Sequence, residues 1–382
     1  MQKEQDQQYK IKPRVNNITS LNNVLTFRLS NINVSLANAI RRTILSDIST
    51  VVFKTTPYEE NKANITVNTS RINNEILKQR LSCIPIHIKD LTTPLKSIRM
   101  ELAVENLTDT MRYVTTGDFI VKNIDTGNNL KEAVIREIFP ANEITGHFIE
   151  VLRLRPKISE AIPGEKIQMT CDFSIGTAKE DSMFNVVSTC AYGYTEDPVR
   201  IEEELAKKIQ QWADQGLSKD DIVHEAANWR LLDAQRITIK DSFDFTIQTV
   251  GVFSNEELVK KACDILIVKL QELDRVIDSD ELKIIPSENT MSNCYDIILE
   301  NEDYTIGKVI EFMLYSKFFE NMEILSFCGF KKMHPHDSDS IIRVAYRDPI
   351  DKAIITQNLK GCISDAIYVF AHVSVLVKPS SA

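Results

Sequence analysis

Glycine and proline are scarce in this 382-residue chain, which contains 11 and 12 of them. Because long flexible linkers are usually rich in such residues, we expect none here. The length predicts two or three compact domains. The chain is 43% hydrophobic and 26% charged, as is typical of globular proteins. Its net charge of −9 argues against a protein that grips nucleic acid through its own charge.

The sequence also lacks the short motifs of common active sites and metal sites. Its seven cysteines are scattered and include no C-x-x-C, so an ordinary structural zinc site is not expected. An odd, scattered set of thiols fits a reducing compartment better than a disulfide framework. Phosphate-binding glycine loops, the G-x-S-x-G elbow and H-E-x-x-H are all missing. We therefore predict no catalytic residue, no cofactor and no bound metal.

Long apolar runs are missing as well. The most hydrophobic stretch, residues 366–377, is about a dozen residues long and includes His372 and Ser374. A membrane-spanning helix needs roughly 20 apolar residues. The polar first residues do not resemble a secretory signal. We expect no secretion and no membrane association.

Among the features that are present, an amphipathic helix is predicted after Ser35, which can cap it. Arg41 and Arg42 lie beside its apolar stripe. They either form a solvated flank or provide a docking face, because guanidinium groups bind carboxylates and carbonyls well. The stripe recurs every four residues: Leu36, Ile40, Ile44 and Ile48.

Periodicity divides the rest of the chain into segments. Short β-like runs separated by turn signals predict a β-rich domain over 87–192. Charged amphipathic stretches predict extra helices within 201–233. After a polar connector at 279–293, the chain repeats the plan of its beginning: strand, short helix, two β segments, long helix. Two such units, each with an apolar helix to cover, would pack economically as a pseudo-twofold pair.

Two polar clusters contain residue types that bind metals. Asp241 and Asp244 are either Mg²⁺ ligands or a solvated strand entrance. His334, His336 and Asp337, in HPHDSD, are either metal ligands or part of a polar turn. The second cluster leaves open a stand-alone metal-dependent hydrolase, and a homodimeric interaction module is a further alternative.

Several segments resemble the alpha-like subunits of multisubunit RNA polymerases, a group that comprises bacterial alpha, its archaeal D-like counterpart and the third-largest eukaryotic subunit. VLTFRLSNINVSLANAIRRTILSDISTVVF (24–53) is similar to the family's signature strand and helix, and RINNEILKQRLSCIPI (71–86) to its next helix. GTAKEDSMFNVVSTCAYGY (176–194) resembles the return from the inserted domain, and FTIQTVG (245–251) the closing strand.

The end of the chain resembles the small partner of that group, which is the eleventh eukaryotic subunit or its archaeal L-like counterpart. ILENEDYTIGKVIEFMLY (298–315) is similar to its Glu-Asp-His-Thr-Leu-Gly motif, with Tyr304 replacing His and Ile306 replacing Leu. FCGFKKMHPHDSDSIIRVAY (327–346) is similar to its Gly-Tyr-x-x-x-His-Pro segment. The chain thus resembles a fusion of the two subunits, of the kind found in nucleocytoplasmic large DNA viruses.

The resemblance implies an α+β fold in which two alpha-like dimerisation domains form an intramolecular pseudo-dimer. A β-rich domain is inserted in the first of them. The implied division has tails at 1–8 and 378–382, an alpha-like domain at 9–86 and 193–278, an insert at 87–192, a linker at 279–293 and a small-subunit-like domain at 294–377. The extra helices at 201–233 are longer than the family pattern, and the family's cysteine cluster is missing from the insert.

The implied role is a non-catalytic assembly platform for transcription that docks the largest and second-largest subunits. Small zinc-binding polymerase subunits are further expected partners, DNA is contacted only indirectly, and the expected locations are the viral factory in the host cytoplasm and the virion. The residues carried over fall into three sets. Docking of the large subunits is assigned to Asn38, Arg41, Arg42 and Arg80. The dimer core is assigned to Leu36, Ile40, Ile44, Ile306, Val309 and Ile310. The small-unit motif is Asp303, Thr305, Gly307, His334 and Pro335.

Overall fold

The computed structural model describes residues 11–159 and 161–377, so the predicted tails at 1–8 and 378–382 lie outside the described residues. The chain forms two compact units. The first comprises the described residues up to Thr43, Thr189–Gln248 and the described residues from Val259 onward. The second comprises Ile44–Ser188 and Thr249–Leu258. Helices and antiparallel sheets occur together in both units, which confirms the predicted α+β class.

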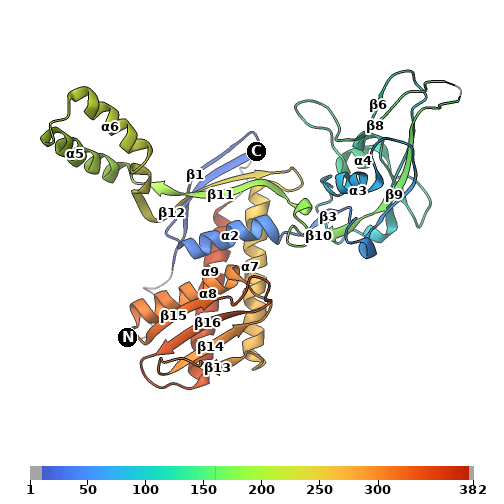
Figure 1. Ribbon diagram of the computed structural model, residues 1–382. Coiled ribbons are helices and arrows are strands. Elements are labelled where there is room, and N and C mark those ends of the chain that lie inside the picture. The colour runs from blue at the N-terminus through green and yellow to red at the C-terminus, as the bar shows by residue number, and fades with distance from the viewer. Residues whose placement is uncertain (1–10, 160, 378–382) are drawn as a thin grey trace. The chain divides into compact units, whose positions relative to one another are not determined.

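The first unit contains two halves with the same strand order (Figure 1). In the N-terminal half the order is β1-β2-β12-β11, and in the C-terminal half it is β13-β14-β16-β15. The N-terminal half is built from β1 (Arg14–Leu21), β2 (Val24–Ser30), α2 (Val34–Ser46), β11 (Val187–Glu196), α5 (Pro198–Asp214), α6 (Lys219–Leu231), η5 (Ala234–Arg236), β12 (Thr238–Thr249) and α7 (Asn255–Asp278). The C-terminal half is built from β13 (Ile284–Pro286), β14 (Cys294–Leu299), α8 (Tyr304–Leu314), η6 (Tyr315–Asn321), β15 (Leu325–Lys331), β16 (Ser340–Tyr346) and α9 (Lys352–Leu376).

The second unit is centred on a four-stranded antiparallel sheet of order β4-β9-β5-β7, with two smaller sheets, β10-β3 and β6-β8. Its core includes a group of phenylalanines in which Phe53 lies 5.1 Å from Phe173 and 6.1 Å from Phe139, measured between ring centroids. Its elements are β3 (Thr50–Val52), η1 (Tyr58–Glu60), β4 (Ala63–Asn68), α3 (Asn74–Ser82), η2 (Leu95–Ser97), β5 (Ile98–Glu105), β6 (Arg112–Thr115), η3 (Thr116–Asp118), β7 (Ile120–Asn123), α4 (Glu132–Ile138), β8 (Glu150–Leu154), β9 (Lys166–Asp172), β10 (Ser174–Gly176) and η4 (Ser182–Phe184).

The observed division of the chain differs from the predicted insert at 87–192. The second unit begins at Ile44, well before residue 87, because β4 pairs with β9 and thereby joins the sheet that contains β5. The predicted linker at 279–293 also differs, since it contains β13, whose Ile285 pairs with Asp296 of β14. Pairing with a strand distant in sequence decided the first point, whereas β13 pairs with the next strand along the chain.

Helix starts follow the chemistry of their caps. Ser254 and Glu257 form a reciprocal capping box at the start of α7, with the Ser254 N–H donating to Glu257 Oε2 at 2.8 Å. The predicted cap of α2 was Ser35, but Asn33 performs this role, because its Oδ1 accepts the Ser35 N–H at 2.9 Å. Asparagine caps a helix as well as serine does, so the residue types alone could not show which of the two caps α2.

The predicted extra helices are present as α5 and α6, which lie between β11 and β12. Asp197 and Ser218 cap them through the N–H groups of Arg200 and Asp221. Their small apolar cluster contains Leu205 and Trp229. The hairpin therefore has a small core of its own at the end of the N-terminal sheet.

Among the described residues, α9 is long and apolar enough by length and composition to span a membrane. Within its most apolar window 39% of the residues are buried inside the protein. Leu359, Ile363 and Phe370 lie on its buried side, and the helix contacts α8 and β1.

Candidate assembly interface

The predicted arginine pair lies on a partly buried side of α2, and its two members face different neighbours. Arg41 donates through Nε to Asn38 Oδ1 of the same helix at 2.9 Å. Burial raises the pKa of the Cys190 thiol to about 12, and the positive charge of Arg41 acts against that shift. Arg41 also acts electrostatically on Tyr192. Arg41 therefore lies beside β11 of its own half.

Arg42 reaches the other half of the first unit. Its Nε donates to Thr305 Oγ1 at 2.9 Å, and its NH2 group donates to Asp303 Oδ2 at 3.0 Å. The Arg42 and Asp303 side chains are 36% and 34% exposed, so solvent screens the ion pair in part. The fork shape of the guanidinium allows one side chain to hold both acceptors. This contact joins α2 to the start of α8.

Asp303 has a second role at the same place, because it is the N-cap of α8. Its Oδ1 accepts the Thr305 N–H at 2.8 Å, while its Oδ2 accepts from Arg42. A carboxylate at a helix N-terminus is favoured by the unpaired N–H groups and the helix dipole. One side chain thus both starts α8 and binds α2.

Gly307 lies one turn further along α8, where it allows close packing. A Cβ at this position would stand 2.0 Å from Cε2 of Phe330 on β15. The same ring contacts Tyr304 edge-on, with centroids 5.1 Å apart. In the matched position of α2, four residues after the cap, the chain has Ala37 instead.

The predicted dimer-core residues are all buried, none of them more than 1% exposed. Their burial agrees with the apolar stripes predicted from the sequence. That the two sets share one core stays a prediction. The set is Leu36, Ile40, Ile44, Ile306, Val309 and Ile310.

The fourth predicted docking residue, Arg80, lies on α3 of the second unit. Its guanidinium donates to the Val151 carbonyl oxygen at 2.8 Å, while Asn38, Arg41 and Arg42 belong to the first unit. The predicted docking set is therefore distributed over both units.

The contacts between α7 and α9 were not predicted from the sequence. Lys360 of α9 pairs with Asp278 at 2.5 Å and lies 3.9 Å from Asp274, both on α7. Lys352 pairs with Asp280, just after α7, at 2.8 Å. In Figure 1 the two long helices lie side by side, α7 in yellow and α9 in red. The sequence shows that the two helices carry opposite charges. It does not show that Lys360 pairs with Asp278, which lies 82 residues away.

The HPHDSD segment is an exposed loop between β15 and β16. His334 Nδ1 accepts the backbone N–H of His336, and the two rings are 5.2 Å apart. Within the described ranges, no group of three His, Cys, Asp or Glu side chains is arranged to hold a metal ion. In the other candidate metal site, formed by Asp241 and Asp244, both carboxylate oxygens of Asp244 accept hydrogen bonds from Arg28 of β2, at 2.7 and 3.1 Å.

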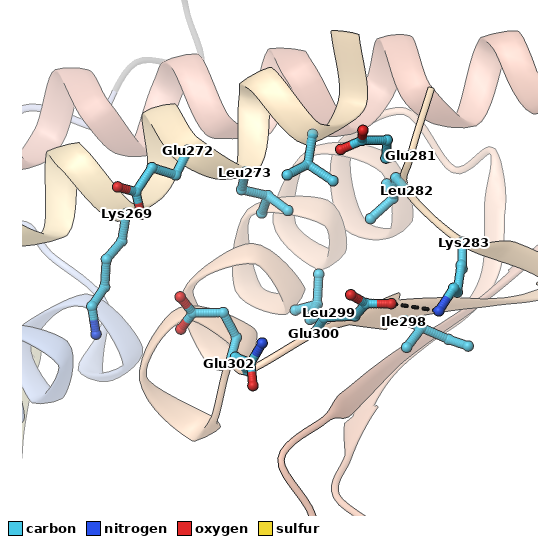
Figure 2. A pocket seen from close by; sticks show the side chains of 12 residues that line it. Lys269, Glu272, Leu273, Glu281, Leu282, Lys283, Ile298, Leu299, Glu300 and Glu302 are labelled. Carbon is cyan, nitrogen blue, oxygen red and sulfur yellow. Dashed lines mark hydrogen bonds and ion pairs between the residues drawn. The ribbon is translucent and has the colours of Figure 1, made fainter. Parts of the chain in front are cut away.

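A hollow of about 310 Å³ lies between α7 and the segment that follows β14 (Figure 2). Leu273, Leu282 and Ile298 supply apolar walls. Lys283 pairs with Glu300 across one side at 2.5 Å. None of the predicted site residues lines this hollow.

Comparison with known proteins identifies the family. Residues 26–270 match the family described as RNA polymerase Rpb3/Rpb11 dimerisation domain. The chain belongs to this family. The match covers all of α2 and most of α7 and ends before the C-terminal half begins.

Curated relatives include polymerase subunits from several eukaryotes. Subunit RPAC1 of DNA-directed RNA polymerases I and III from Bos taurus is 25% identical over 301 residues, which cover 66% of this chain and 82% of the relative. Subunit RPB3 of DNA-directed RNA polymerase II from Schizosaccharomyces pombe is 24% identical over 267 residues, covering 68% and 85%. Subunit 3B of DNA-directed RNA polymerases IV and V from Arabidopsis thaliana is 23% identical over 309 residues, covering 67% and 89%.

Proposed function

We propose that this chain is a non-catalytic subunit of a multisubunit DNA-directed RNA polymerase and serves as the platform on which the enzyme assembles. The observation that carries the proposal is the family match over residues 26–270, together with the names of the curated relatives as polymerase subunits. The absence of catalytic motifs in the sequence is consistent with a platform role, in which partner chains supply the chemistry.

The proposal includes an intramolecular pseudo-dimer of the two halves. Support comes from the shared strand order and from the contacts that join the halves, namely Arg42 with Asp303 and Lys360 with Asp278. A covalent connection turns a two-body association into an internal one, with an effective concentration of roughly millimolar for a short linker. It also holds the two halves at a ratio of one to one.

We further propose that the chain is a viral fusion of the two subunits, which acts in the host cytoplasm and is packaged in the virion. This part rests on the resemblance of residues 298–315 and 327–346 to the small partner subunit. Purification of the tagged chain from its native source, followed by identification of the co-eluting chains, tests it. Recovery of two large polymerase subunits is expected, with small zinc-binding subunits beside them. A preparation in which no polymerase chain co-elutes would overturn the proposal.

The large subunits are proposed to dock on Asn38, Arg41, Arg42 and Arg80, and DNA is contacted only through the complex. Because Arg42 also binds Asp303, Arg41→Glu is the sharper variant for docking. It should leave the chain folded and reduce recovery of the large subunits in a pull-down at least several-fold, while Arg28→Gln, on the β2–β12 sheet, recovers them normally. Undiminished recovery with the double variant Arg41→Glu/Arg42→Glu would contradict the docking assignment.

A further inference from the structure

The helix caps provide a common register for α2 and α8. Asn33 accepts the Ser35 N–H at 2.9 Å, and Asp303 accepts the Thr305 N–H at 2.8 Å. Both caps are therefore bonded to the residue two positions later. Counting from the caps aligns the buried stripes as well, since Leu36 corresponds to Ile306 and Ile40 to Ile310.

In this register the two halves differ in the groups that meet across their contact. Arg42 stands nine residues after its cap, and the residue nine after Asp303 is Phe312. Arg42 binds the carboxylate cap of the other half. By sequence position, the uncharged Phe312 is the counterpart of Arg42, and the neutral Asn33 is the counterpart of Asp303. The charged pair Arg42–Asp303 therefore has two uncharged residues at the matched positions.

We propose that Arg42, Asp303 and Asn33 determine which halves pair. This inference rests on the pairing of halves within the proposed function and specifies its selectivity. The pairing of an N-terminal half with a C-terminal half satisfies the guanidinium. A pair of N-terminal halves from two copies would set two guanidinium groups against neutral amides. A pair of C-terminal halves would set two carboxylates against phenylalanine rings.

The physical basis of this selection is the cost of a partly buried charge without its partner. A mismatched pair loses the charge-assisted hydrogen bonds that Asp303 and Thr305 now make with Arg42, and gains no equivalent ones. Specificity of this kind is a difference between two affinities, and it needs an element that disfavours the wrong partner. Here that element is the uncharged cap of the N-terminal half.

Two cap exchanges separate charge from capping. Asp303→Asn removes the charge but keeps a good cap, because asparagine and aspartate cap helices about equally well. Asn33→Asp does the reverse and gives the N-terminal half a carboxylate that Arg42 of a second copy can bind. Folding of α2 and α8 should therefore survive both changes. Arg28→Gln is the control, because it removes a similarly exposed ion pair within one half.

The experiment uses the full chain with a protease site inserted after Ser279, which is exposed. The folded protein is cleaved, mixed with an isotopically labelled cleaved preparation, and analysed by native mass spectrometry. The unmodified halves should remain paired as one N-terminal with one C-terminal half. Asp303→Asn should raise their dissociation constant roughly fivefold, the range of a partly exposed ion pair. The combination Asn33→Asp/Asp303→Asn should raise the share of N-terminal pairs several-fold.

Two results would count against the inference in different ways. If both cap exchanges behave like the Arg28→Gln control while the unmodified halves stay paired, the pairing stands and the proposed selection by charge is wrong. If the unmodified halves separate on cleavage, the proposed pairing itself is contradicted, and the selection falls with it.

Discussion

The two halves of the first unit share one strand order, and they differ at three matched places. The cap of the first short helix is Asn33 in one half and Asp303 in the other. Four residues later stand Ala37 and Gly307. Where β11 and β12 are joined by the helices α5 and α6, the matched strands β15 and β16 are joined by the short loop containing His334. A common backbone plan thus carries different residues at the matched positions.

The largest expected effect comes from placing a charge in either buried stripe. Ile40→Asp and Ile310→Asp each bury a carboxylate without a partner, because both isoleucines are at most 1% exposed. Each change should lower the free energy of unfolding by about 3–5 kcal/mol, measured by urea denaturation. Ile354→Asp on α9 is the control, since this side chain is 44% exposed. Equal, small effects at both buried sites would contradict the assignment of these stripes to the core.

A smaller effect is expected where α2 and α8 need different residues. Gly307→Ala forces a methyl group against the Phe330 ring and should cost about 1–3 kcal/mol. Ala37→Gly, at the matched position of α2, should cost only about 1 kcal/mol through helix propensity. Thermal unfolding of both variants measures the difference. In a Phe330→Ala background, Gly307→Ala should cost less stability than it does in the unmodified chain, because the ring that clashes with the new methyl group is gone.

The cross-strand ion pairs give a pH-dependent comparison. Hydrogen bonds from Arg343 hold the pKa of the Asp296 carboxyl below its usual range. A carboxyl whose pKa is lower in the folded than in the unfolded protein stabilises the fold at pH values above its unfolded-state pKa of about 4. This contribution is lost as the pH falls through the folded-state pKa. Asp296→Asn should therefore cost about 2 kcal/mol at pH 7 and lose its effect progressively below pH 4. Urea titrations at both pH values check this.

Asp244→Asn, in the N-terminal half, should cost less at pH 7. Its side chain is 46% exposed, against 10% for Asp296, so solvent screens the pair with Arg28 more strongly. A larger loss from Asp244→Asn than from Asp296→Asn would reverse the expected order of the two sheets.

The smallest effect is expected from removing the helical hairpin. Replacing residues 199–236 by a short turn makes the β11–β12 connection resemble β15–β16. The hairpin keeps its own apolar cluster around Leu205 and Trp229, so the N-terminal sheet should lose no more than about 1 kcal/mol of stability. Circular dichroism melting of the shortened chain measures this, and a cooperative transition near that of the full chain is expected.

Local sequence signals found the elements but not the pairing between distant ones. The apolar stripe of α2, the capping box of α7 and the separate helices α5 and α6 were all readable from period and cap chemistry. Strand β4 was misplaced in the domain division, because it pairs with β9, which is distant in sequence. Strand β13 pairs with the neighbouring β14, but it lies in a polar segment that predicted a connector. The assignment of Asn33 rather than Ser35 as the cap of α2 was a choice between two equally good residues.

The sequence by itself predicted the amphipathic helix that carries Arg41 and Arg42 and the repeated order of elements near the end of the chain, because apolar periodicity depends only on local order. Tertiary structure alone decided what the second arginine touches. Asp303 lies 261 residues from Arg42, and nothing in the residues around either one identifies the other. Periodicity reports which face of a helix is buried, whereas the partner of a charge depends on where two folded halves meet.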